Sequence, residues 1–538
     1  MLNFSAPPHR KNRGADFVFL GASLLFMLKS VDPGSGRSWI IGSCCGGALP
    51  YLVNKRLYII PLHKKYALFF RSWYGGNIFV SMKKLQEGVP SSSPLAFGFV
   101  VGTTSLAFVV SQLDVSIVNI ALPRIAESFS AGISVLQWIV DAYTIAFAVL
   151  MLSAGGMSDL LGAKRVFLFG LLLFGVASVG CGVAWDAGSL IGFRALQGVG
   201  SATMIPSSLA ILNQSFSHDR EQRARAVALW TAAGGVSIAA GPILGGFLIH
   251  LSSWRLIFLV NIPICLVGIL LGLRLPESER HPNRGFDIPG QLTWLLALTA
   301  FIGAIIEWNE LGFSHPFIWG GILCSGLLIL LFLRIERRSA APILPLDFFR
   351  SANFNVLVLL GVCLNNSYYG TVFVLSLYLQ DVLHYTPLHA GLAFLPLTAG
   401  FIVSNLISGK LMAKYGTRLP VLVGALVGMS GFMGLLMING HTSYIQLFLP
   451  FFTIPMGMGL AVPAMTTGIL ATVDRTRSGT ASAVLNTTRQ AAGALGVAVF
   501  GAMATGGPVA IVDGIHLSAL ISAAMLMGCF LLLFRHVE

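Results

Sequence analysis

The sequence is poor in charged residues, and this scarcity argues against a soluble protein. Only 10% of its 538 residues are Asp, Glu, Lys or Arg, whereas a soluble domain carries roughly 25%. Hydrophobic residues make up 55% of the chain, and the mean hydropathy is +0.80. So few charges cannot cover the surface of a water-exposed globule of this size. The sequence therefore predicts a protein whose surface is mostly in contact with lipid.

Cysteine is also scarce, and its distribution argues against disulfides and metal sites. Among the seven cysteines, Cys44 and Cys45 are adjacent, there is no CxxC pair, and the others stand alone in apolar runs. A disulfide framework or a zinc site needs clustered cysteines. We therefore expect neither a metal site nor a cofactor.

The net charge of +13 does not indicate a nucleic-acid-binding surface. Residues 1–81 hold ten Lys or Arg and only two acids. Elsewhere the basic residues form short clusters between apolar runs, without a basic face interleaved with aromatic residues. This is the pattern of membrane loops, so no nucleic-acid partner is expected.

Long apolar runs dominate the chain from residue 96 onward. A helix needs about 20 mostly apolar residues to cross the ~30 Å hydrocarbon core of a bilayer. Several runs contain glycine or proline, which membrane helices tolerate when neighbouring groups satisfy the backbone. We predict fourteen spans, at approximately 96–122, 136–156, 165–185, 188–212, 224–250, 255–275, 288–308, 316–335, 353–380, 388–410, 418–438, 443–472, 478–505 and 514–535.

Lysine and arginine are distributed unevenly between the loops that join these runs. If the segment before the first run is cytoplasmic, twenty Lys or Arg fall in cytoplasmic loops, and only Arg124 and Arg255 fall outside. Cytoplasmic loops of membrane proteins carry an excess of positive residues. The pattern therefore predicts a multi-pass protein of the bacterial cytoplasmic (inner) membrane, with both ends of the helical body in the cytoplasm.

Two segments of the chain repeat each other. Residues 155–165 read GGMSDLLGAKR and residues 409–418 read GKLMAKYGTR, at an offset of 254 residues. In each segment two glycines stand seven residues apart and a basic residue follows. Two six-helix halves of the same hand, separated by a two-helix insert, would produce this offset. Parallel repeats of this kind place a substrate site between the halves, near the bilayer midplane.

Three acidic residues within the runs are candidates for proton or cation binding, because an ionisable group in a membrane segment usually faces an interior or an aqueous cavity. Asp114, in SQLDVSIVNIALP, either binds a proton or cation or only bonds neighbouring helices. Asp141, in LQWIVDAYTIAFAVL, either is a second such site or is solvated near the outer end of its run. Glu307, in IIEWNEL, is either a third site or an acid at the membrane interface beside Trp308.

Two arginines also fall inside runs. A guanidinium stays charged, so an arginine in lipid requires a partner. Arg194, in LIGFRALQGVGSA, is expected either to face a cavity and tune the proton affinity of a carboxylate, or to belong to a purely structural network. Arg489, in LNTTRQAAGALG, has the same two interpretations.

The fifth run contains the small-residue motif AAGPILGGF. Its proline removes one backbone hydrogen bond and kinks the helix, while its glycines allow backbones to approach closely. The motif predicts either a hinge for a gate or a small-residue packing seam, and the two are compatible. Its residues are Gly241, Pro242, Gly245 and Gly246.

In order along the chain, these motifs resemble the major facilitator superfamily and, within it, the fourteen-helix drug:proton antiporter branch (EmrB/QacA type). The resemblance extends from about residue 96 to the C-terminus. It implies an all-α polytopic membrane protein with the major facilitator fold, in which 14 transmembrane helices form two six-helix bundles and a two-helix insert. The motifs that carry it are LDVSIVNIALP, GGMSDLLGAKR, RALQGVGSA, AAGPILGGF, WRLIFLVNIP, FDIPG and LYLQDVLHYTPLHAGLAFLP.

The resemblance also implies roles for individual residues. Asp114 would be a coupling or substrate carboxylate, and Arg194 would be its proton-transfer partner. The fifth-run motif would be the antiporter hinge. A cytoplasmic gate loop would contain Gly155, Asp159, Gly162, Lys164 and Arg165.

The predicted domains are an N-terminal extension (1–95), an N-terminal six-helix bundle (96–285), an insert with the seventh and eighth runs (286–350) and a C-terminal six-helix bundle (351–538). The expected function is proton-coupled export of drugs or biocides, hydrophobic cationic small molecules, by alternating access. The partners would be this small-molecule substrate, protons and the lipid bilayer; the sequence does not decide whether a periplasmic adaptor takes part. The alternative cargo is a physiological metabolite or siderophore. A membrane-embedded enzyme is least favoured, because the eleven histidines are scattered.

Residues 1–81 have no counterpart in this resemblance. Their apolar patches are short and interrupted by charge, and Met82 precedes two lysines, a short polar stretch and the first run. We therefore expect the natural chain to begin at Met82. The alternative is a poorly ordered basic extension or an extra re-entrant element.

Deletion of residues 1–81 is accordingly expected to leave transport intact. The measurement is drug efflux from cells that carry equal membrane levels of the full-length and the truncated protein. Loss of efflux by the truncated protein would show that the segment contributes to function.

Overall fold

The chain divides into two units, Met1–Ala96 and Phe97–Glu538, which are described separately. The computed structural model describes residues 17–20, 23–32, 35–44, 50–53, 56–59, 70–71, 77–78, 94–217, 219–278, 287–339, 344, 346–473 and 477–536. Met82, the expected start of the natural chain, lies outside these residues.

The first unit contains short antiparallel strands, which the sequence analysis did not predict. Strands β1, β2 and β3 form one sheet in that order, and β4–β5 and β6–β7 form two further pairs. The strands are β1 (Phe17–Leu20), β2 (Ser23–Asp32), β3 (Ser35–Cys44), β4 (Pro50–Val53), β5 (Arg56–Ile59), β6 (Phe70–Arg71) and β7 (Asn77–Ile78).

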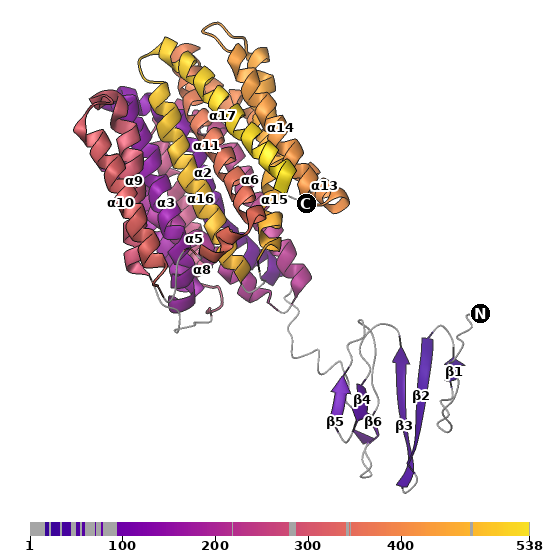
Figure 1. The fold of residues 1–538 in the computed structure, drawn as a ribbon. Coiled ribbons are helices and arrows are strands. Elements are labelled where there is room, and N and C mark those ends of the chain that lie inside the picture. Colours follow the sequence, from indigo (N-terminus) through magenta and orange to yellow (C-terminus); the bar gives the residue numbers. More distant parts are fainter. Residues whose placement is uncertain are drawn as a thin grey trace. The chain divides into compact units, whose positions relative to one another are not determined.

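The second unit is a bundle of helices (Figure 1), which confirms the all-α prediction for this part of the chain. Its N-terminal helices are α2 (Pro94–Phe129), α3 (Ile133–Leu161), α4 (Ala163–Gly182), α5 (Ala187–Ser215), α6 (Arg220–Leu251), α7 (Leu256–Leu259) and α8 (Asn261–Gly272). Next come α9 (Ile288–Leu311), α10 (Pro316–Glu336) and η1 (Leu346–Arg350). The C-terminal helices are α11 (Ala352–Leu377), η2 (Tyr378–Val382), α12 (Pro387–Ala393), α13 (Leu395–Tyr415), α14 (Arg418–Gly434), η3 (Leu435–Met437), α15 (Tyr444–Ala471), α16 (Ser478–Met503) and α17 (Pro508–His536).

Many of these helices are long and apolar enough to cross a membrane. Within the described residues there are eleven such helices, or twelve if Glu221–Ile238 and Ala240–Leu251, which meet at a 42° bend, count as one span. Leu256–Gly272 is apolar but shorter, and α16 is not among the eleven. The chain is therefore a multi-pass membrane protein, although length and composition do not establish the predicted count of fourteen spans.

The predicted internal repeat has a counterpart in the backbone. Gly162 lies between α3 and α4 with a φ of +92°, and Gly416 ends α13 just before α14 with a φ of +74°. The two glycines are 254 residues apart, which is the offset of the repeated segments. A positive φ is costly for residues with a Cβ atom. The repeat therefore preserves a glycine where each half makes the same sharp turn between helices.

The N-terminal and C-terminal helices meet along two equivalent seams. Helix α3 packs against α16, and α6 packs against α12 and α13. Shifted by the repeat offset, α3 corresponds to α12–α13 and α6 corresponds to α16, so one contact maps onto the other. Parallel repeats related by a two-fold axis along the membrane normal produce this arrangement.

Polar side chains cross between the two sets of helices. Gln137 Nε2 in α3 donates to the carbonyl oxygens of Val497 (2.9 Å) and Ala498 (2.6 Å) in α16. Gln380 Nε2 in η2 donates to the Ile120 carbonyl of α2 (3.1 Å). These bonds hold the N-terminal and C-terminal helices together in the state that the structure shows.

Helices α9 and α10 form a hairpin at the edge of the bundle (Figure 1). Helix α9 packs against both α3 and α16, and α10 packs against α9. The polar contacts of α9 reach α3: Ser134 Oγ donates to the Ile306 carbonyl (3.3 Å), and Gln291 Nε2 donates to the Val149 carbonyl (3.1 Å). The hairpin therefore covers the outside of the α3–α16 seam.

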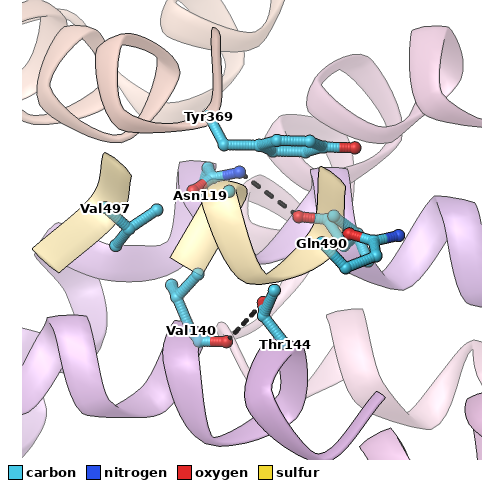
Figure 2. Close-up of a pocket in the computed structure, with 8 residues that line it drawn as sticks. Asn119, Val140, Thr144, Tyr369, Gln490 and Val497 are labelled. Carbon is cyan, nitrogen blue, oxygen red and sulfur yellow. Dashed lines mark hydrogen bonds between the residues drawn. The ribbon is translucent and has the colours of Figure 1, made fainter. Parts of the chain in front are cut away.

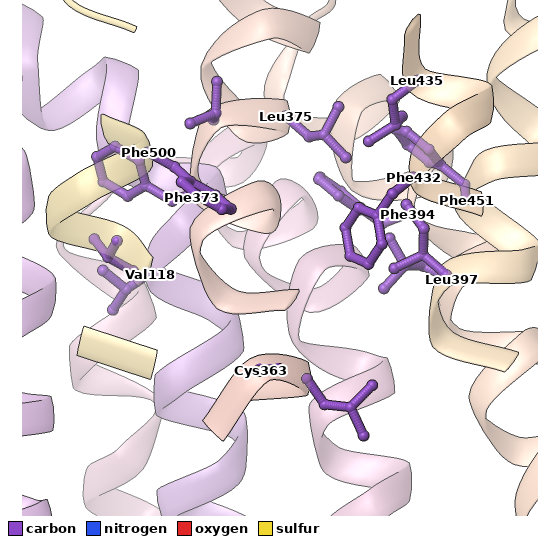
Figure 3. Packing of buried hydrophobic residues seen from close by; sticks show 14 of the residues in the cluster. Val118, Cys363, Phe373, Leu375, Phe394, Leu397, Phe432, Leu435, Phe451 and Phe500 are labelled. Atoms are coloured by element: carbon purple, nitrogen blue, oxygen red, sulfur yellow. The ribbon is translucent and has the colours of Figure 1, made fainter. Parts of the chain in front are cut away.

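The C-terminal helices pack through aromatic side chains (Figure 3). The rings of Phe394 and Phe451 stack at a centroid distance of 5.5 Å, and Phe432 and Leu435 belong to the same buried cluster. Phe373 of α11 is also buried in this cluster. Lipid provides little hydrophobic force between helices, so close packing of this kind is a main source of their association.

Candidate functional site

Asp114 and Arg194 form an ion pair in the middle of the N-terminal helices. Arg194 Nη1 of α5 donates to Asp114 Oδ2 of α2. Both residues are buried, with exposed fractions of 0% for Asp114 and 1% for Arg194. Arg194 Nε also donates to the Ile139 carbonyl of α3 (3.0 Å), so this one side chain connects three helices.

Two amide side chains complete the surroundings of the carboxylate. Asp114 Oδ1 accepts from Gln197 Nε2 (3.2 Å) and from Asn261 Nδ2 (2.9 Å). Gln197 Nε2 also donates to Ser178 Oγ (2.8 Å), and its Oε1 accepts from Arg194 Nη1 (2.9 Å). A buried ion pair is tolerated only when further hydrogen bonds satisfy its remaining polar atoms. This network meets that requirement for Asp114.

A second layer of contacts fixes the arginine. The Arg194 guanidinium lies over the Tyr143 ring, 4.5 Å from its centroid, and the Tyr143 hydroxyl is hydrogen-bonded to Ser111 Oγ (2.8 Å) and Ser201 Oγ (2.7 Å).

Helix α5, which carries Arg194, begins at a capping box in which Asp186 accepts from the Ser189 N–H (2.6 Å). That backbone N–H holds the pKa of the Asp186 carboxyl below its ordinary value.

Asp141 is the second buried carboxylate, and its surroundings differ sharply. Its exposed fraction is 0%, and within the described part of the chain neither carboxylate oxygen has a hydrogen-bond partner. The interpretation that Asp141 is solvated near the end of its run is therefore wrong. By helical spacing Asp141 shares a face of α3 with Trp138 and Ile145, residues that pack in an apolar cluster with α9 and α16.

Glu307 lies on α9, beside the same seam. Its Oε1 accepts from Trp138 Nε1 of α3 at 2.9 Å, and the side chain is half-buried. Its hydrogen-bond partner is thus Trp138 rather than the neighbouring Trp308. The structure brings Glu307 of α9 to Trp138, about one helical turn from Asp141 on α3. Within the described residues, neither acid is among the hydrogen-bond partners of Asp114 or Arg194.

Arg489 lies on α16, among the C-terminal helices. Its side chain is partly exposed, its Nε is buried without a hydrogen-bond partner, and no ion pair involves it within the described residues. It therefore differs from Arg194, whose guanidinium is paired. The expectation of a partner is met for Arg194 alone.

A pocket lies between the N-terminal and C-terminal helices, and one of its lining residues, Gln490, directly follows Arg489 in the sequence. In the state described its cavity volume is only about 10 Å³, roughly the room for one water molecule. Helices α2, α3, α11 and α16 contribute its walls. Figure 2 shows Tyr369 on one side and Val140 and Thr144 on the opposite side. Its lining residues carry no charge and are Val115, Asn119, Val140, Thr144, Tyr369, Gln490, Gly493 and Val497.

The predicted gate loop is mostly helical. Helix α3 continues through Gly155 to Leu161, Gly162 makes the turn, and α4 starts at the next residue. Lys164 Nζ forms an ion pair with Glu277 (3.0 Å), and Arg165 is exposed. The side chain of Asp159 lies outside the described residues. The prediction of a loop is therefore wrong, because a single glycine with positive φ suffices for the turn.

The predicted hinge residues lie at a bend and in a packing seam. The two parts of α6 meet at 42° between Ile238 and Ala240, and Pro242 has no N–H to donate to the Ile238 carbonyl. A Cβ on Gly245 would come within 2.8 Å of Ile117 Cγ1, and one on Gly246 within 2.8 Å of Leu388 Cα. Gly241 likewise faces Ser116. The motif thus shows the predicted kink and the predicted close packing, while its role as the hinge of a gate stays a prediction.

Several residues of these sites were not identified from the sequence. Asn261 lies in the WRLIFLVNIP motif, where a polar side chain in an apolar run was the available signal. Asn119 and Thr144 also line the pocket but are common in membrane helices. Nothing in their spacing distinguishes them from residues that bond only to their own helix.

Comparison with known proteins places these sites in a family context. The model of the Major Facilitator Superfamily matches residues 104–497. The methylenomycin A resistance protein of Streptomyces coelicolor is 34% identical over 404 residues, which cover 74% of this chain and 85% of the relative. The puromycin resistance protein pur8 of Streptomyces alboniger is 35% identical over 459 residues, which cover 81% and 89%. The multidrug resistance protein Stp of Mycobacterium tuberculosis is 32% identical over 401 residues, which cover 74% of each chain.

A solved structure shows the same fold. A bacterial homolog of the human lysosomal transporter Spinster, in an inward-facing and unoccupied conformation, superposes with a TM-score of 0.60. The match covers 82% of this chain and 97% of that chain at 16% sequence identity. At this identity the likeness concerns the fold alone.

The buried ion pair is expected to show strong energetic coupling. Asp114→Asn and Arg194→Gln each leave the remaining charge buried without its counterion, which costs about 3–5 kcal/mol. The double variant removes both charges and should lose less stability than the sum of the single variants. The measurement is thermal unfolding of the four purified proteins in detergent.

An exposed pair provides the control for this cycle. Arg124 Nη1 and Glu127 Oε2 are 2.8 Å apart but largely exposed, so their coupling should be at most about 1 kcal/mol. Additive losses for Asp114 and Arg194 would contradict the buried network described above.

The close contact of α6 with α12 gives a second expected outcome. Gly246→Ala should lower stability by about 1–3 kcal/mol, because the added Cβ has no room beside Leu388. Gly235→Ala on the same helix is the matched control, since its Cβ would meet only Phe401, at 3.9 Å. The control should be neutral or slightly stabilising, as alanine favours helices over glycine. Equal melting temperatures for the two variants would show that the contact is loose.

Proposed function

The chain belongs to the major facilitator superfamily, and from this premise we propose that it exports hydrophobic drugs or biocides in exchange for protons. Three of its relatives are named for resistance to methylenomycin A, to puromycin and to multiple drugs. Each of them matches this chain over roughly three quarters or more of both lengths. The family and the solved transporter of the same fold indicate a transporter rather than an enzyme.

The proposed membrane arrangement follows the predicted runs. Each of the fourteen runs contains a helix, with α7–α8 and α12–α13 each filling one run. We propose fourteen spans in the bacterial cytoplasmic membrane, as two six-helix bundles with the α9–α10 hairpin outside them and both ends of the helical body in the cytoplasm. The peripheral position of the hairpin on α3 and α16 and the equivalence of the two seams support this arrangement.

The pocket between α2, α3, α11 and α16 is the proposed substrate site. It lies where parallel repeats of a transporter meet. Its walls combine apolar side chains, an aromatic ring and three neutral polar groups. This composition suits hydrophobic organic molecules with a few hydrogen-bonding groups. Alternating access would open the pocket to each side as the contacts across the seams exchange.

The two buried carboxylates have different proposed roles. The charge of Asp114 is balanced by Arg194, and two side-chain amides donate hydrogen bonds to the carboxylate, so it can remain ionised at little cost. Asp141 has no such partners, and burying an unpaired charge is far more costly than burying a neutral carboxyl group. Asp141 therefore holds the exchanged proton in the state that the structure shows. The absence of hydrogen bonds to its carboxylate within the described residues is the observation that carries this proposal.

Arg194 and Asp114 support this role from the neighbouring helices. Arg194 bonds the Ile139 carbonyl, two residues before Asp141 on α3. A change in the Asp114–Arg194 pair would therefore move the segment that bears Asp141. The sequence-based expectation that Asp114 itself exchanges a proton for a cation would require the loss of the Arg194 bond. Asp141 could bind and release a proton without breaking the hydrogen bonds between Asp114 and Arg194.

Asp141→Asn tests the proposal. Asparagine resembles a protonated carboxyl group in size and charge, so folding and insertion should be normal. Proton-coupled drug efflux should fall at least about tenfold, because the side chain can no longer release a proton. The measurement is efflux of drug from cells lacking other exporters, with and without a protonophore.

Asp513→Asn provides the matched control, since it makes the same change at an exposed position of α17. This variant should transport like the wild type. If Asp141→Asn exports drug at the wild-type rate and with the wild-type sensitivity to protonophore, Asp141 is structural and the coupling lies elsewhere, with Asp114 as the next candidate.

A further inference from the structure

One positive charge beside the proposed substrate pocket has no counterion in the described part of the chain. Arg489 is next to Gln490, which lines the pocket, and one helical turn before Gly493, which lines it as well. The lining residues are all uncharged. We propose that Arg489 binds an anionic group of the exported substrate, such as a carboxylate or a phenolate. This inference rests on the proposed export function and specifies its substrate.

The stem of Arg489 is held by close packing. A Cβ on Gly361 of α11 would come within 3.3 Å of Arg489 Cγ and within 3.2 Å of Met465 Sδ. The missing side chain at Gly361 thus provides the space that the arginine stem fills. The stem is thus fixed between α11, α15 and α16. Within the described residues, the buried Nε–H has no hydrogen-bond acceptor. A fixed cation with unused donors is arranged for a ligand rather than for a helix contact.

Tyr369 of α11 marks the side of the pocket nearest to Arg489 in the chain. This phenol lines the pocket together with Gln490, the residue next to Arg489 on α16. Its ring packs on Gly493, where a Cβ would lie 3.0 Å from Tyr369 Cδ2. Figure 2 shows the ring lying across one side of the pocket, beside Gln490. An anion that enters along this ring would meet Arg489 and the amide of Gln490 together.

The acidic residues of the neighbouring helices are not arranged to neutralise Arg489. Asp114 is bonded to Arg194, Gln197 and Asn261, and Glu307 accepts from Trp138. Asp141 does not line the pocket, is fully buried and forms no ion pair within the described residues. An arginine presents several N–H donors that match the two oxygens of a carboxylate. The counterion is therefore supplied by the cargo.

This site has consequences for substrate choice and for energetics. Cationic drugs, which the sequence analysis favoured, would be repelled by Arg489, whereas acidic and zwitterionic drugs would gain a charged hydrogen bond. Export of an anion in exchange for a proton moves charge in the direction that an inside-negative potential favours. Transport of an acidic drug should therefore respond to the membrane potential as well as to the pH gradient.

A pair of dyes provides a direct test. The first is a xanthene dye with a free benzoate, and the second is the methyl ester of the same dye. Binding to the purified full-length protein in detergent is followed by fluorescence polarisation, so the result does not depend on proton coupling. Wild type should bind the acid more tightly than the ester. Arg489→Gln should weaken binding of the acid about ten- to hundredfold and leave binding of the ester within about twofold.

Two further variants define the role of the charge. Arg489→Lys keeps a positive charge and should retain part of the affinity for the acid. Arg124→Gln removes a positive charge from an exposed pair outside the pocket, and both dyes should bind to it as to wild type. Equal effects of Arg489→Gln on both dyes would overturn the proposal, because they would indicate a structural role for the arginine.

An inorganic anion is the rival occupant. If wild type binds the ester only in chloride and not in gluconate, and this chloride dependence disappears in Arg489→Gln, the site holds chloride and the proposal is wrong. Efflux assays separate this inference from the proposed function. Selective loss of acid binding in Arg489→Gln supports the anion site even if wild-type efflux proves insensitive to protonophore, a result that would contradict only proton coupling.

Discussion

The buried ion pair between Asp114 and Arg194 is the constraint on which the N-terminal half of the molecule depends. A permanent guanidinium charge cannot lie among membrane helices without an anion. Asp114 supplies that anion, Gln197 and Asn261 complete its hydrogen bonds, and α2, α5 and α8 are tied together as a result. Because the pair is neutral as a whole, it leaves neither charge available to a ligand in the state described.

The proposed roles of two other ionisable residues, Asp141 and Arg489, follow from the neutrality of this pair. Within the described residues, the Asp141 carboxylate on α3 has no hydrogen bond, and Arg489, next to the pocket-lining Gln490 on α16, has no ion-pair partner. One is arranged to hold a proton, and the other is arranged to hold an anion. Because the two residues lie on different helices, α3 and α16, proton and substrate need not compete for one site. Coupling would instead act through the contact between α3, which carries Asp141, and α16, which carries Arg489.

The sequence predicted the helices well, since long apolar runs in a chain with so few charges admit few other structures. It also predicted the repeat, because Gly162 and Gly416 mark the same turn in each half. It could not predict that Asn261 reaches Asp114 across 147 residues, or that Asp141 is fully buried rather than exposed to water. Those facts depend on how each helix is rotated against its neighbours. The number of spans could not be established from the sequence either, because α16 contains the polar residues Thr, Asn, Arg and Gln, and because α7–α8 is short.

Proton-coupled export is the central claim, and transport by the purified protein in liposomes tests it most directly. With the membrane potential clamped, a pH gradient alone should drive a drug up its concentration gradient, in the direction opposite to the proton flow. Addition of a protonophore should return the drug to equal concentrations on both sides. Drug movement that is the same with and without the pH gradient would contradict the account.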